Sequence, residues 1–177
     1  MSFTKTMFII DNNFLSEESR CFIEKNVLGH SFPYYYSANT IHNPPDNNPY
    51  MSNDIVKRPE ERALGETVIS PYANDFLRIL KEFVDKNNIE VKEVLRASVN
   101  ITFAGNTDRC PTHTDHPYPH DQLLVYLNDC LDKEAYTVVG DVKIQPEKYK
   151  GVCFKSAPHY MIFPKKGARV VAVYTFR

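Results

Sequence analysis

Two histidines and an aspartate in the second half of the chain have the types and the spacing of a metal site. His113 and Asp115 are separated by one residue, and in an extended chain residues two apart project to the same face. An imidazole and a carboxylate can therefore converge on one ion. His159 is the candidate third ligand from another strand, because it opens the apolar segment Tyr160 to Phe163. The pattern predicts that these three residues bind one divalent metal.

The ligand set and a downstream arginine indicate which metal and which chemistry. Two histidines and one carboxylate on one face of an octahedral metal leave positions open, as is typical of iron(II) in non-haem oxygenases. Arg169 follows His159 by ten residues, after the turn Lys165-Lys166-Gly167. A hairpin there would place Arg169 near the metal, able to hold a carboxylate through two parallel hydrogen bonds. A His-x-Asp pair alone is common by chance, so the prediction of iron(II) rests on the triad together with Arg169.

A zinc site is an alternative for the same loop. Cys110, His113, His116 and His120 could supply four ligands, but structural zinc sites usually pair ligands from two separated elements. These four residues lie in one short segment with three prolines. We interpret His116 and His120 as polar residues of a stiff loop near the mouth of the metal site.

Helices are predicted in the first half of the chain. Ser16 has the type of an N-cap for a helix that runs to about Leu28, with Gly29 as its stop. Ser70 as N-cap and Pro71 at the first helical position predict a second helix that fades near residue 87. Residues 37–68 between them are poorly patterned, which predicts a lid, a binding loop or a disordered segment. The aromatic run at residues 34–36 is interpreted as a strand packed on the core rather than as a binding surface.

Strands dominate the second half. After a first short strand at residues 7–10, Val, Ile, Phe, Tyr and Thr enrichment predicts strands at residues 91–103, 122–127, 136–144, 151–154, 160–163 and 169–176. Helices followed by strands predict an α+β protein whose β part is a sandwich or barrel. We expect one domain over residues 1–177, with a helical support and lid region at 1–90 and a metal-binding β-barrel core at 91–177.

Composition excludes some partners. The 177 residues carry a formal net charge of −1 with a pI near 6.6, so nucleic acid and anionic membranes are not expected partners. No segment near the start is long enough for a signal peptide or a membrane span. The four cysteines form no CxxC pair. We therefore expect reduced thiols in a cytoplasmic protein. The sequence does not indicate an oligomeric state.

Several segments of the second half match a known pattern. They are Phe103-Ala104-Gly105, His113-Thr114-Asp115, Leu124 to Asp129, Gly151 to Phe154 and His159 through Arg169. On these segments, over about residues 95–177, the chain resembles the 2-oxoglutarate- and Fe(II)-dependent dioxygenases, especially the prolyl-4-hydroxylase-like branch. The resemblance implies a double-stranded β-helix, which is a jelly-roll or cupin-like barrel, with the N-terminal helices packed on one sheet.

The resemblance also implies roles and a reaction. His113, Asp115 and His159 would hold iron, and Arg169, helped by the Tyr126 hydroxyl, would bind the distal carboxylate of 2-oxoglutarate. The implied reaction consumes O2 and 2-oxoglutarate, releases succinate and CO2, and hydroxylates a C–H bond. The expected substrate is a peptidyl residue, with proline as the first guess, or a small metabolite.

The chain departs from the family pattern at two positions. Phe103 stands where a tyrosine is common in prolyl hydroxylases, and Val171 stands where a small polar residue is often found. We expect these two residues and Ile101 to line the pocket. Thr175 occupies the place of a second arginine of the nucleic-acid demethylases, which argues against base repair. Two other functions stay open: a cupin-type metalloenzyme that does not use 2-oxoglutarate, and a catalytically silent barrel that serves as a binding module.

Overall fold

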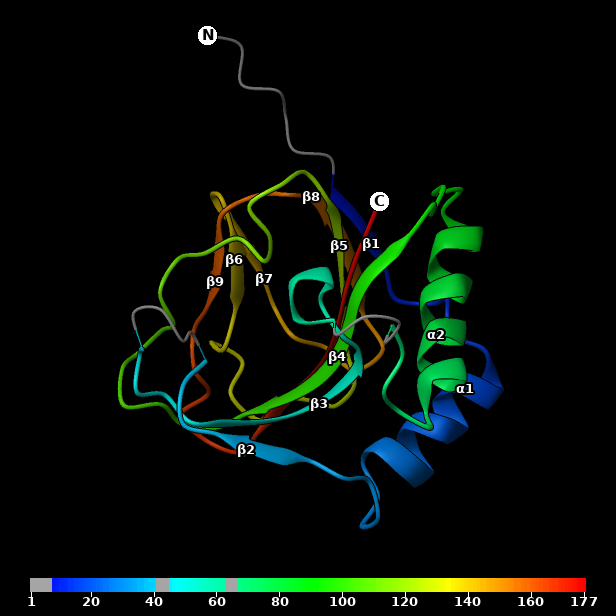
Figure 1. The fold of residues 1–177 in the computed structure, drawn as a ribbon. Coiled ribbons are helices and arrows are strands. Elements are labelled where there is room, and N and C mark those ends of the chain that lie inside the picture. Colours follow the sequence, from blue (N-terminus) through cyan, green and yellow to red (C-terminus); the bar gives the residue numbers. More distant parts are fainter. Residues whose placement is uncertain (1–7, 41–44, 63–66) are drawn as a thin grey trace, which may run out of the picture.

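Two antiparallel sheets face each other, and two helical segments cover the outside of the larger one (Figure 1). The computed structural model describes residues 8–40, 45–62 and 67–177. No helix in these ranges is long and apolar enough to cross a membrane.

The larger sheet contains seven strands in the order β1-β8-β5-β10-β4-β3-β2. Each neighbouring pair runs antiparallel. Its strands are β1 (Phe8–Asp11), β2 (Tyr35–Ser37), β3 (Tyr50–Val56), β4 (Val94–Thr102), β5 (Asp121–Tyr126), β8 (Gly151–Lys155) and β10 (Arg169–Phe176). Of the predicted strand at residues 7–10, Met7 lies outside the described residues.

The smaller sheet contains three strands in the order β7-β6-β9. They are β6 (Thr137–Val139), β7 (Val142–Ile144) and β9 (His159–Met161). Side chains of β5, β8 and β10 meet side chains of β6 and β7 in a buried apolar cluster between the two sheets. This cluster stabilises the face-to-face arrangement, because each sheet removes the apolar face of the other from water.

The first helical segment begins where the sequence predicts. The Ser16 side chain accepts a hydrogen bond from the Ser19 backbone N–H at 3.1 Å and caps α1 (Glu17–Phe22). The chain continues as a π-helix, η1 (Ile23–Val27). A Cβ at Gly29 would lie 2.3 Å from the Lys25 carbonyl oxygen. Only glycine fits at this close approach, which confirms Gly29 as the stop.

The second helix, α2 (Ala73–Lys86), begins later than the sequence predicts. The Ser70 hydroxyl accepts from the Tyr72 backbone N–H at 3.2 Å, and the Ser70 carbonyl accepts from Ala73 N–H at 3.1 Å. Ser70 and Pro71 therefore form a turn before the helix instead of its cap and first position. A further short helix, η2 (Pro59–Glu61), follows β3.

Helices and sheet share the main core. The apolar stripe of α2 packs with η1 on one face of the larger sheet, where alternate residues of β4, β5 and β10 belong to the same buried cluster. The Tyr174 hydroxyl on β10 donates to the Phe76 carbonyl of α2 at 3.0 Å. Because side chains alternate along a strand, the intervening residues of these strands face the smaller sheet.

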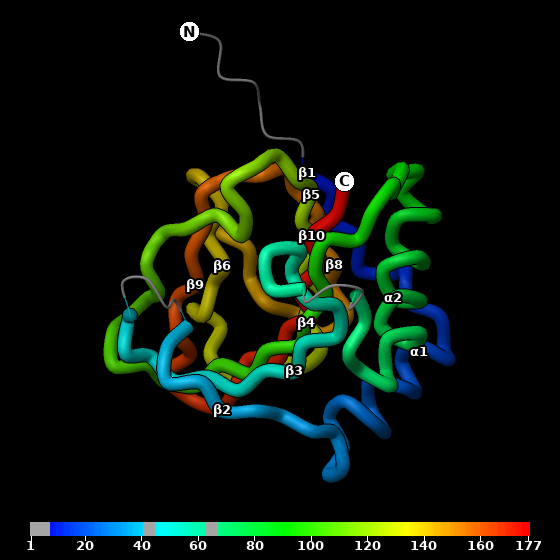
Figure 2. Tube along the Cα trace, in the orientation of Figure 1, coloured from blue at the N-terminus to red at the C-terminus, as the bar shows by residue number. Residues whose placement is uncertain are grey.

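The stretch at residues 37–68 is largely structured, contrary to expectation. It contains β3, which pairs with β4 along most of its length (Figure 2), and η2. Residues 41–44 and 63–66 of this stretch lie outside the described residues. The expected division at residue 90 is also wrong, since β1, β2 and β3 all belong to the larger sheet.

Candidate metal centre and adjoining cavity

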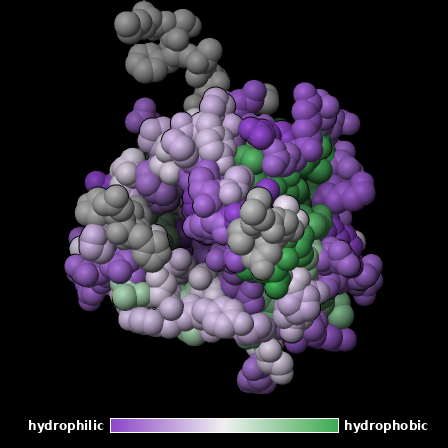
Figure 3. All heavy atoms as spheres, viewed as in Figure 1, coloured by the Kyte–Doolittle hydropathy of each residue, from purple (hydrophilic) through white to green (hydrophobic). Residues whose placement is uncertain are grey.

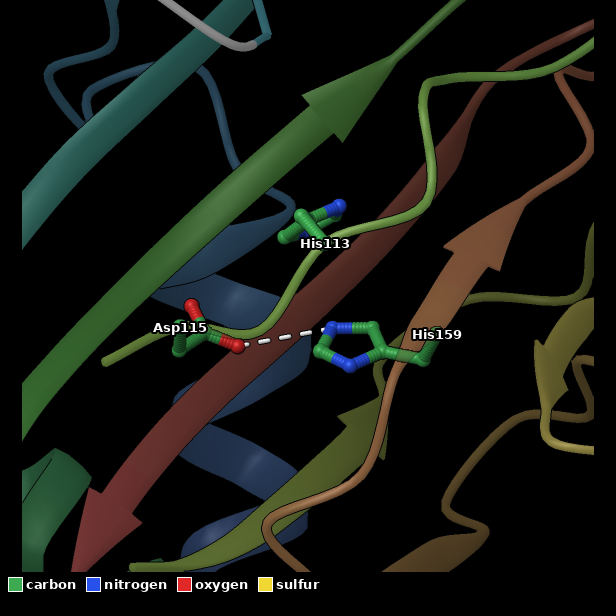
Figure 4. Close-up of side chains that lie close together, drawn as sticks. All are labelled: His113, Asp115 and His159. Carbon is green, nitrogen blue, oxygen red and sulfur yellow. Dashed lines mark ion pairs between the residues drawn. The ribbon is translucent and has the colours of Figure 1, made fainter. Parts of the chain in front are cut away.

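His113, Asp115 and His159 converge as the sequence predicts. One ligand atom from each lies within 4.8 Å of the others. The backbones of His113 and His159 exchange two hydrogen bonds, of 3.0 and 2.9 Å, which join the loop before β5 to β9. Figure 4 shows Asp115 and His159 approaching from these two segments, and the dashed line marks a 3.4 Å contact between Asp115 Oδ2 and His159 Nε2.

Backbone carbonyls orient both imidazoles in the same way. His113 Nδ1–H donates to the Pro111 carbonyl at 2.9 Å, and His159 Nδ1–H donates to the Ala157 carbonyl at 3.0 Å. Each contact sets the tautomer that leaves Nε2 without a proton. An imidazole in this tautomer is ready to coordinate a metal through Nε2.

Two arginines hold the carboxylate of the triad. Arg96 Nη1 and Arg58 Nη2 approach Asp115 Oδ1 at 3.0 and 3.2 Å, and Arg58 Nη1 also donates to the Asp115 carbonyl. Burial by itself would raise the pKa of the Asp115 carboxyl, but the positive charges of Arg96 and Arg58 act in the opposite direction and help to hold that pKa well below its usual value. Asp115 Oδ2 is buried and accepts no hydrogen bond. His159 Nε2 also lies 3.4 Å from the Gln122 side-chain nitrogen. A carboxylate oxygen without a hydrogen-bond donor beside two unprotonated Nε2 atoms is a donor set that fits iron(II).

Sequence reasoning missed Arg58 and Arg96. Arg58 follows β3 in the unpatterned stretch, where no local signal marks it. Arg96 stood within a predicted strand, where a charged residue among apolar ones is a signal that could have found it.

Arg169 is buried without a carboxylate partner. The residue is 5% exposed, and its side chain contacts Thr137 Oγ1 at 3.3 Å and Met161 Sδ at 2.9 Å, while Nε has no partner. No ion pair joins it to any carboxylate of the described residues. A buried guanidinium with free donors is costly unless an anion binds it. The arrangement therefore fits a carboxylate ligand.

Arg169 lies close to the metal centre, although the hairpin expected between residues 160–163 and 169–176 does not form. β9 pairs with β6, whereas β10 pairs with β4 and β5, so the two segments belong to facing sheets. Met161, which contacts Arg169, is two residues after His159 on β9. Residues two apart on a strand share a face about 7 Å apart. A short dicarboxylate can span that separation.

Tyr126 supports this end of the cavity indirectly. It is fully buried, and its hydroxyl donates to Thr137 Oγ1 at 2.7 Å. Thr137 and Arg169 line the cavity, whereas Tyr126 is not among the lining residues. Tyr126 therefore orients Thr137, which in turn contacts Arg169.

Of the three residues expected to line the pocket, only Val171 does so. Ile101 packs against the main core on the opposite face of β4, because it alternates with the cavity-facing Asn100 and Thr102. Phe103 follows the end of β4 and is 41% exposed. The expectation for Ile101 was wrong by one step of the strand alternation. The expectation for Phe103 was wrong because this residue lies beyond the end of β4 and is not among the residues that line the cavity.

The four residues of the zinc alternative do not converge. Cys110 Sγ accepts from the Met161 backbone N–H at 3.2 Å. His116 Nε2 lies 2.8 Å from the Thr175 hydroxyl, and His120 Nδ1–H donates to the Tyr118 carbonyl at 2.9 Å. Within the described ranges, the triad is the one group with metal-binding geometry.

A cavity of about 500 Å³ joins the metal centre to Arg169. Its walls come from the inner face of the larger sheet, from β9 and from the loop that carries His113. Figure 3 shows that the viewed surface is largely hydrophilic on the side of β6 and β9 and hydrophobic beside α2. A polar cavity of this size accommodates a metal, a small dicarboxylate and part of a substrate.

The fold is shared with solved oxygenase structures. An oxidoreductase of the 2OG-Fe(II) oxygenase family from Burkholderia pseudomallei superposes with a TM-score of 0.72 at 15% identity, covering 96% of this chain and 84% of that one. A prolyl hydroxylase from Trichoplax adhaerens, in complex with a hypoxia inducible factor oxygen degradation domain peptide fragment, superposes with a TM-score of 0.60 at 18% identity. This match covers 96% of this chain and 83% of that one. The viral collagen prolyl hydroxylase of Paramecium Bursaria Chlorella virus-1, in its 2OG complex, superposes with a TM-score of 0.57 at 14% identity. This match covers 95% of this chain and 94% of that one.

These similarities establish the fold. No family model matches the chain, and no curated protein does. The chain therefore has the fold of 2OG-Fe(II) oxygenases, with a His-Asp-His site and a buried arginine that pairs with no carboxylate of the described residues.

Proposed function

We propose that the protein is an Fe(II)- and 2-oxoglutarate-dependent dioxygenase that hydroxylates a C–H bond, and that its two sheets form a double-stranded β-helix. One observation carries the proposal: the buried Arg169, which lacks a carboxylate partner, lies in the same cavity as the three converging ligand atoms. Iron(II) with 2-oxoglutarate and O2 would supply the oxidising chemistry, with release of succinate and CO2.

The residues of the chain divide the work. His113, Asp115 and His159 would hold the metal through their free donor atoms. Arg169 would bind the distal carboxylate of 2-oxoglutarate, with Thr137 accepting one guanidinium hydrogen bond and Tyr126 orienting Thr137. Leu124, Val171 and Val173 line the cavity beside them. These apolar side chains would exclude water from the methylene groups of the bound cosubstrate.

The proposed substrate is a peptidyl residue, with proline as the first candidate, or a small metabolite. Support comes from the solved structures of the same fold, which include prolyl hydroxylases and one peptide complex. A cupin-type enzyme without 2-oxoglutarate is disfavoured, because nothing in its chemistry would neutralise Arg169. A silent binding module is disfavoured because both imidazoles and Asp115 Oδ2 are oriented as ligands.

The decisive experiment adds Fe(II) and then 2-oxoglutarate under anaerobic conditions and records the visible charge-transfer band of a chelated 2-oxoacid. Admission of O2 should then yield succinate. Asp115→Ala should abolish the band. Arg169→Ala should raise the 2-oxoglutarate concentration needed for half-saturation at least about tenfold while leaving metal binding intact.

Lys166→Ala serves as the matched control, since it removes an exposed cation from the turn before Arg169. This variant should behave as the wild type does. Absence of both the band and succinate in the wild-type protein would refute the proposed function.

A further inference from the structure

The cavity has a second polar wall, on the side of β3 and β4. Tyr50, Ser52 and Asp54 of β3 lie opposite Thr102, Asn100 and Ser98 of β4, respectively. Strand alternation places all six on the inner face of the sheet. Asp54 and Asn100 line the same cavity as the metal ligands.

Hydrogen-bond acceptors on this wall lack partners. Ser98 Oγ and Asn100 Oδ1 are buried and form no hydrogen bond, and Ser98 is 1% exposed. Asp54 is half-buried, and its side chain forms no hydrogen bond or ion pair with any described residue. Buried acceptors without donors are unfavourable and indicate that a ligand supplies them.

The cations of the cavity do not neutralise Asp54. Arg58 and Arg96 both donate hydrogen bonds to Asp115. Arg169 contacts Thr137 and Met161, on the far side of the cavity. Two further acidic residues line the cavity: Glu61, which is exposed on η2, and Asp54, which lies on the inner face of the sheet. If iron and 2-oxoglutarate occupy the proposed positions, Asp54 is the carboxylate of this wall that forms no ion pair within the described residues.

Tyrosine side chains extend the same face outward. Tyr50 lines the cavity. Tyr35 of the edge strand β2 lies opposite Ser52 and is 65% exposed. Aromatic rings attract cations through their negative faces. The wall therefore combines one negative charge, neutral acceptors and aromatic rings, which together favour a cation.

We propose that the substrate presents a cationic donor group, an alkylammonium or a guanidinium, to Asp54, with Asn100 Oδ1 accepting a further hydrogen bond. This inference rests on the proposed function and names its substrate class. It concerns the charged group and not the carbon that is hydroxylated. A peptide with a basic residue beside a hydroxylated proline satisfies it as well as a basic residue that is itself hydroxylated.

The test measures binding to protein loaded with Zn(II) and 2-oxoglutarate, which cannot turn over. Blocked pentapeptides with a central lysine, norleucine or glutamate between alanines are titrated, and protein amide chemical shifts are followed by NMR. Pentylammonium and its neutral counterpart 1-pentanol form a second pair. A preference of about tenfold for the cation over its neutral partner is expected in at least one pair. If only the lysine peptide is preferred over its neutral partner, the substrate is a peptide with a basic residue. If only pentylammonium is preferred over 1-pentanol, the substrate is a free amine.

Variants assign the preference to Asp54. Asp54→Asn, which keeps the shape of the side chain, should abolish the preference for the cation. Asp54→Lys should shift it toward the glutamate peptide. Asp141→Asn, a change at an exposed aspartate in the turn between β6 and β7, should leave it as in the wild type. The amide spectra also show whether each variant is folded.

The inference is overturned if neither cation is preferred, or if Asp54→Asn keeps the wild-type preference. The charge-transfer band of the wild-type protein is recorded separately. Loss of that band counts against the proposed function, whereas a normal band without cation preference counts against this inference alone.

Discussion

At the scale of single residues, the carboxylate of Asp115 is restrained on one side and free on the other. Arg58 and Arg96 both contact Oδ1, and Oδ2 has no hydrogen-bond donor. The guanidinium groups limit rotation of the carboxylate and direct one oxygen toward the histidines. The two arginines therefore favour coordination through a single oxygen, which leaves other positions of the metal open.

Removal of Arg96 should weaken metal binding. Arg96→Met keeps much of the apolar stem but loses the contact that orients Asp115. Loss of such a supporting contact typically lowers metal affinity about 10–100-fold. The metal affinity of Arg96→Lys should fall between those of Arg96→Met and the wild type, because lysine keeps the positive charge but lacks the planar guanidinium. Titration with Co(II), followed by its visible absorption, gives the affinity and reports ligand geometry through the band shape.

Arg177→Met is the control for the loss of an arginine ion pair. Arg177 pairs with Glu93 at 2.8 Å on the surface, away from the metal ligands. Its Co(II) affinity and band shape should match the wild type. Equal affinity and an unchanged spectrum in Arg96→Met would contradict the role assigned to this arginine.

The residues that sequence reasoning found are those whose signal is local. His113 and Asp115 are neighbours on one extended segment, so their convergence follows from strand geometry alone. Arg58 reaches Asp115 across 57 positions of the chain, and nothing near it in the sequence indicates that contact. Ile101 was misplaced because an error of one position in a strand moves a side chain to the opposite face.

At the scale of elements, Glu82 of α2 joins the two helical segments. Its carboxylate accepts from the Ser16 backbone N–H at 3.0 Å and from the Ser16 and Ser19 hydroxyls at 2.6 and 2.9 Å. The start of α1 is therefore held by the neighbouring helix as well as by its own cap. This arrangement sets the angle at which α1 meets α2 on the sheet.

Glu82→Ala should destabilise the protein by about 1–2 kcal/mol, because it leaves the Ser16 and Ser19 donors, one of them on a buried side chain, without an acceptor. Chemical denaturation followed by circular dichroism measures the free energy of unfolding. Lys81→Ala breaks the exposed ion pair with Asp85 on the same helix and should cost less than about 0.5 kcal/mol. Equal effects of the two substitutions would contradict the link through Glu82.

Strand β3 shows why some elements escape sequence reasoning. One face of it lines a polar cavity, and on the other the Asn53 side chain donates to the Pro33 carbonyl at 2.8 Å. Its segment therefore lacks the apolar alternation that predicts a half-buried strand. Strands β5, β8 and β10 were found because they carry apolar side chains on both faces, one against the helices and one against the smaller sheet.

At the scale of the whole molecule, both halves of the chain build one core and one cavity. β3 supplies Tyr50 and Asp54 to the cavity. Arg58, which follows the end of β3, lines the cavity as well. The helices of the first half cover the outer face of strands from the second half. The metal ligands all come from the second half, yet the sheet that supports them depends on the first.

A fragment of residues 91–177 should therefore not fold alone, although it contains every predicted metal ligand and Arg169. Without α1, η1 and α2, it would expose the face of the sheet that is buried in the intact chain: Ala97, Val99, Leu123, Val125, Ala172 and Tyr174. Without β3, the edge of β4 would be unpaired, and Asp115 would lose Arg58. Exposed apolar surface and an open strand edge favour aggregation over folding. Thermal unfolding followed by circular dichroism should show a cooperative transition for the intact chain and none for the fragment. A cooperative transition in the fragment, together with Co(II) binding of wild-type affinity, would show that the first half is dispensable for the metal centre.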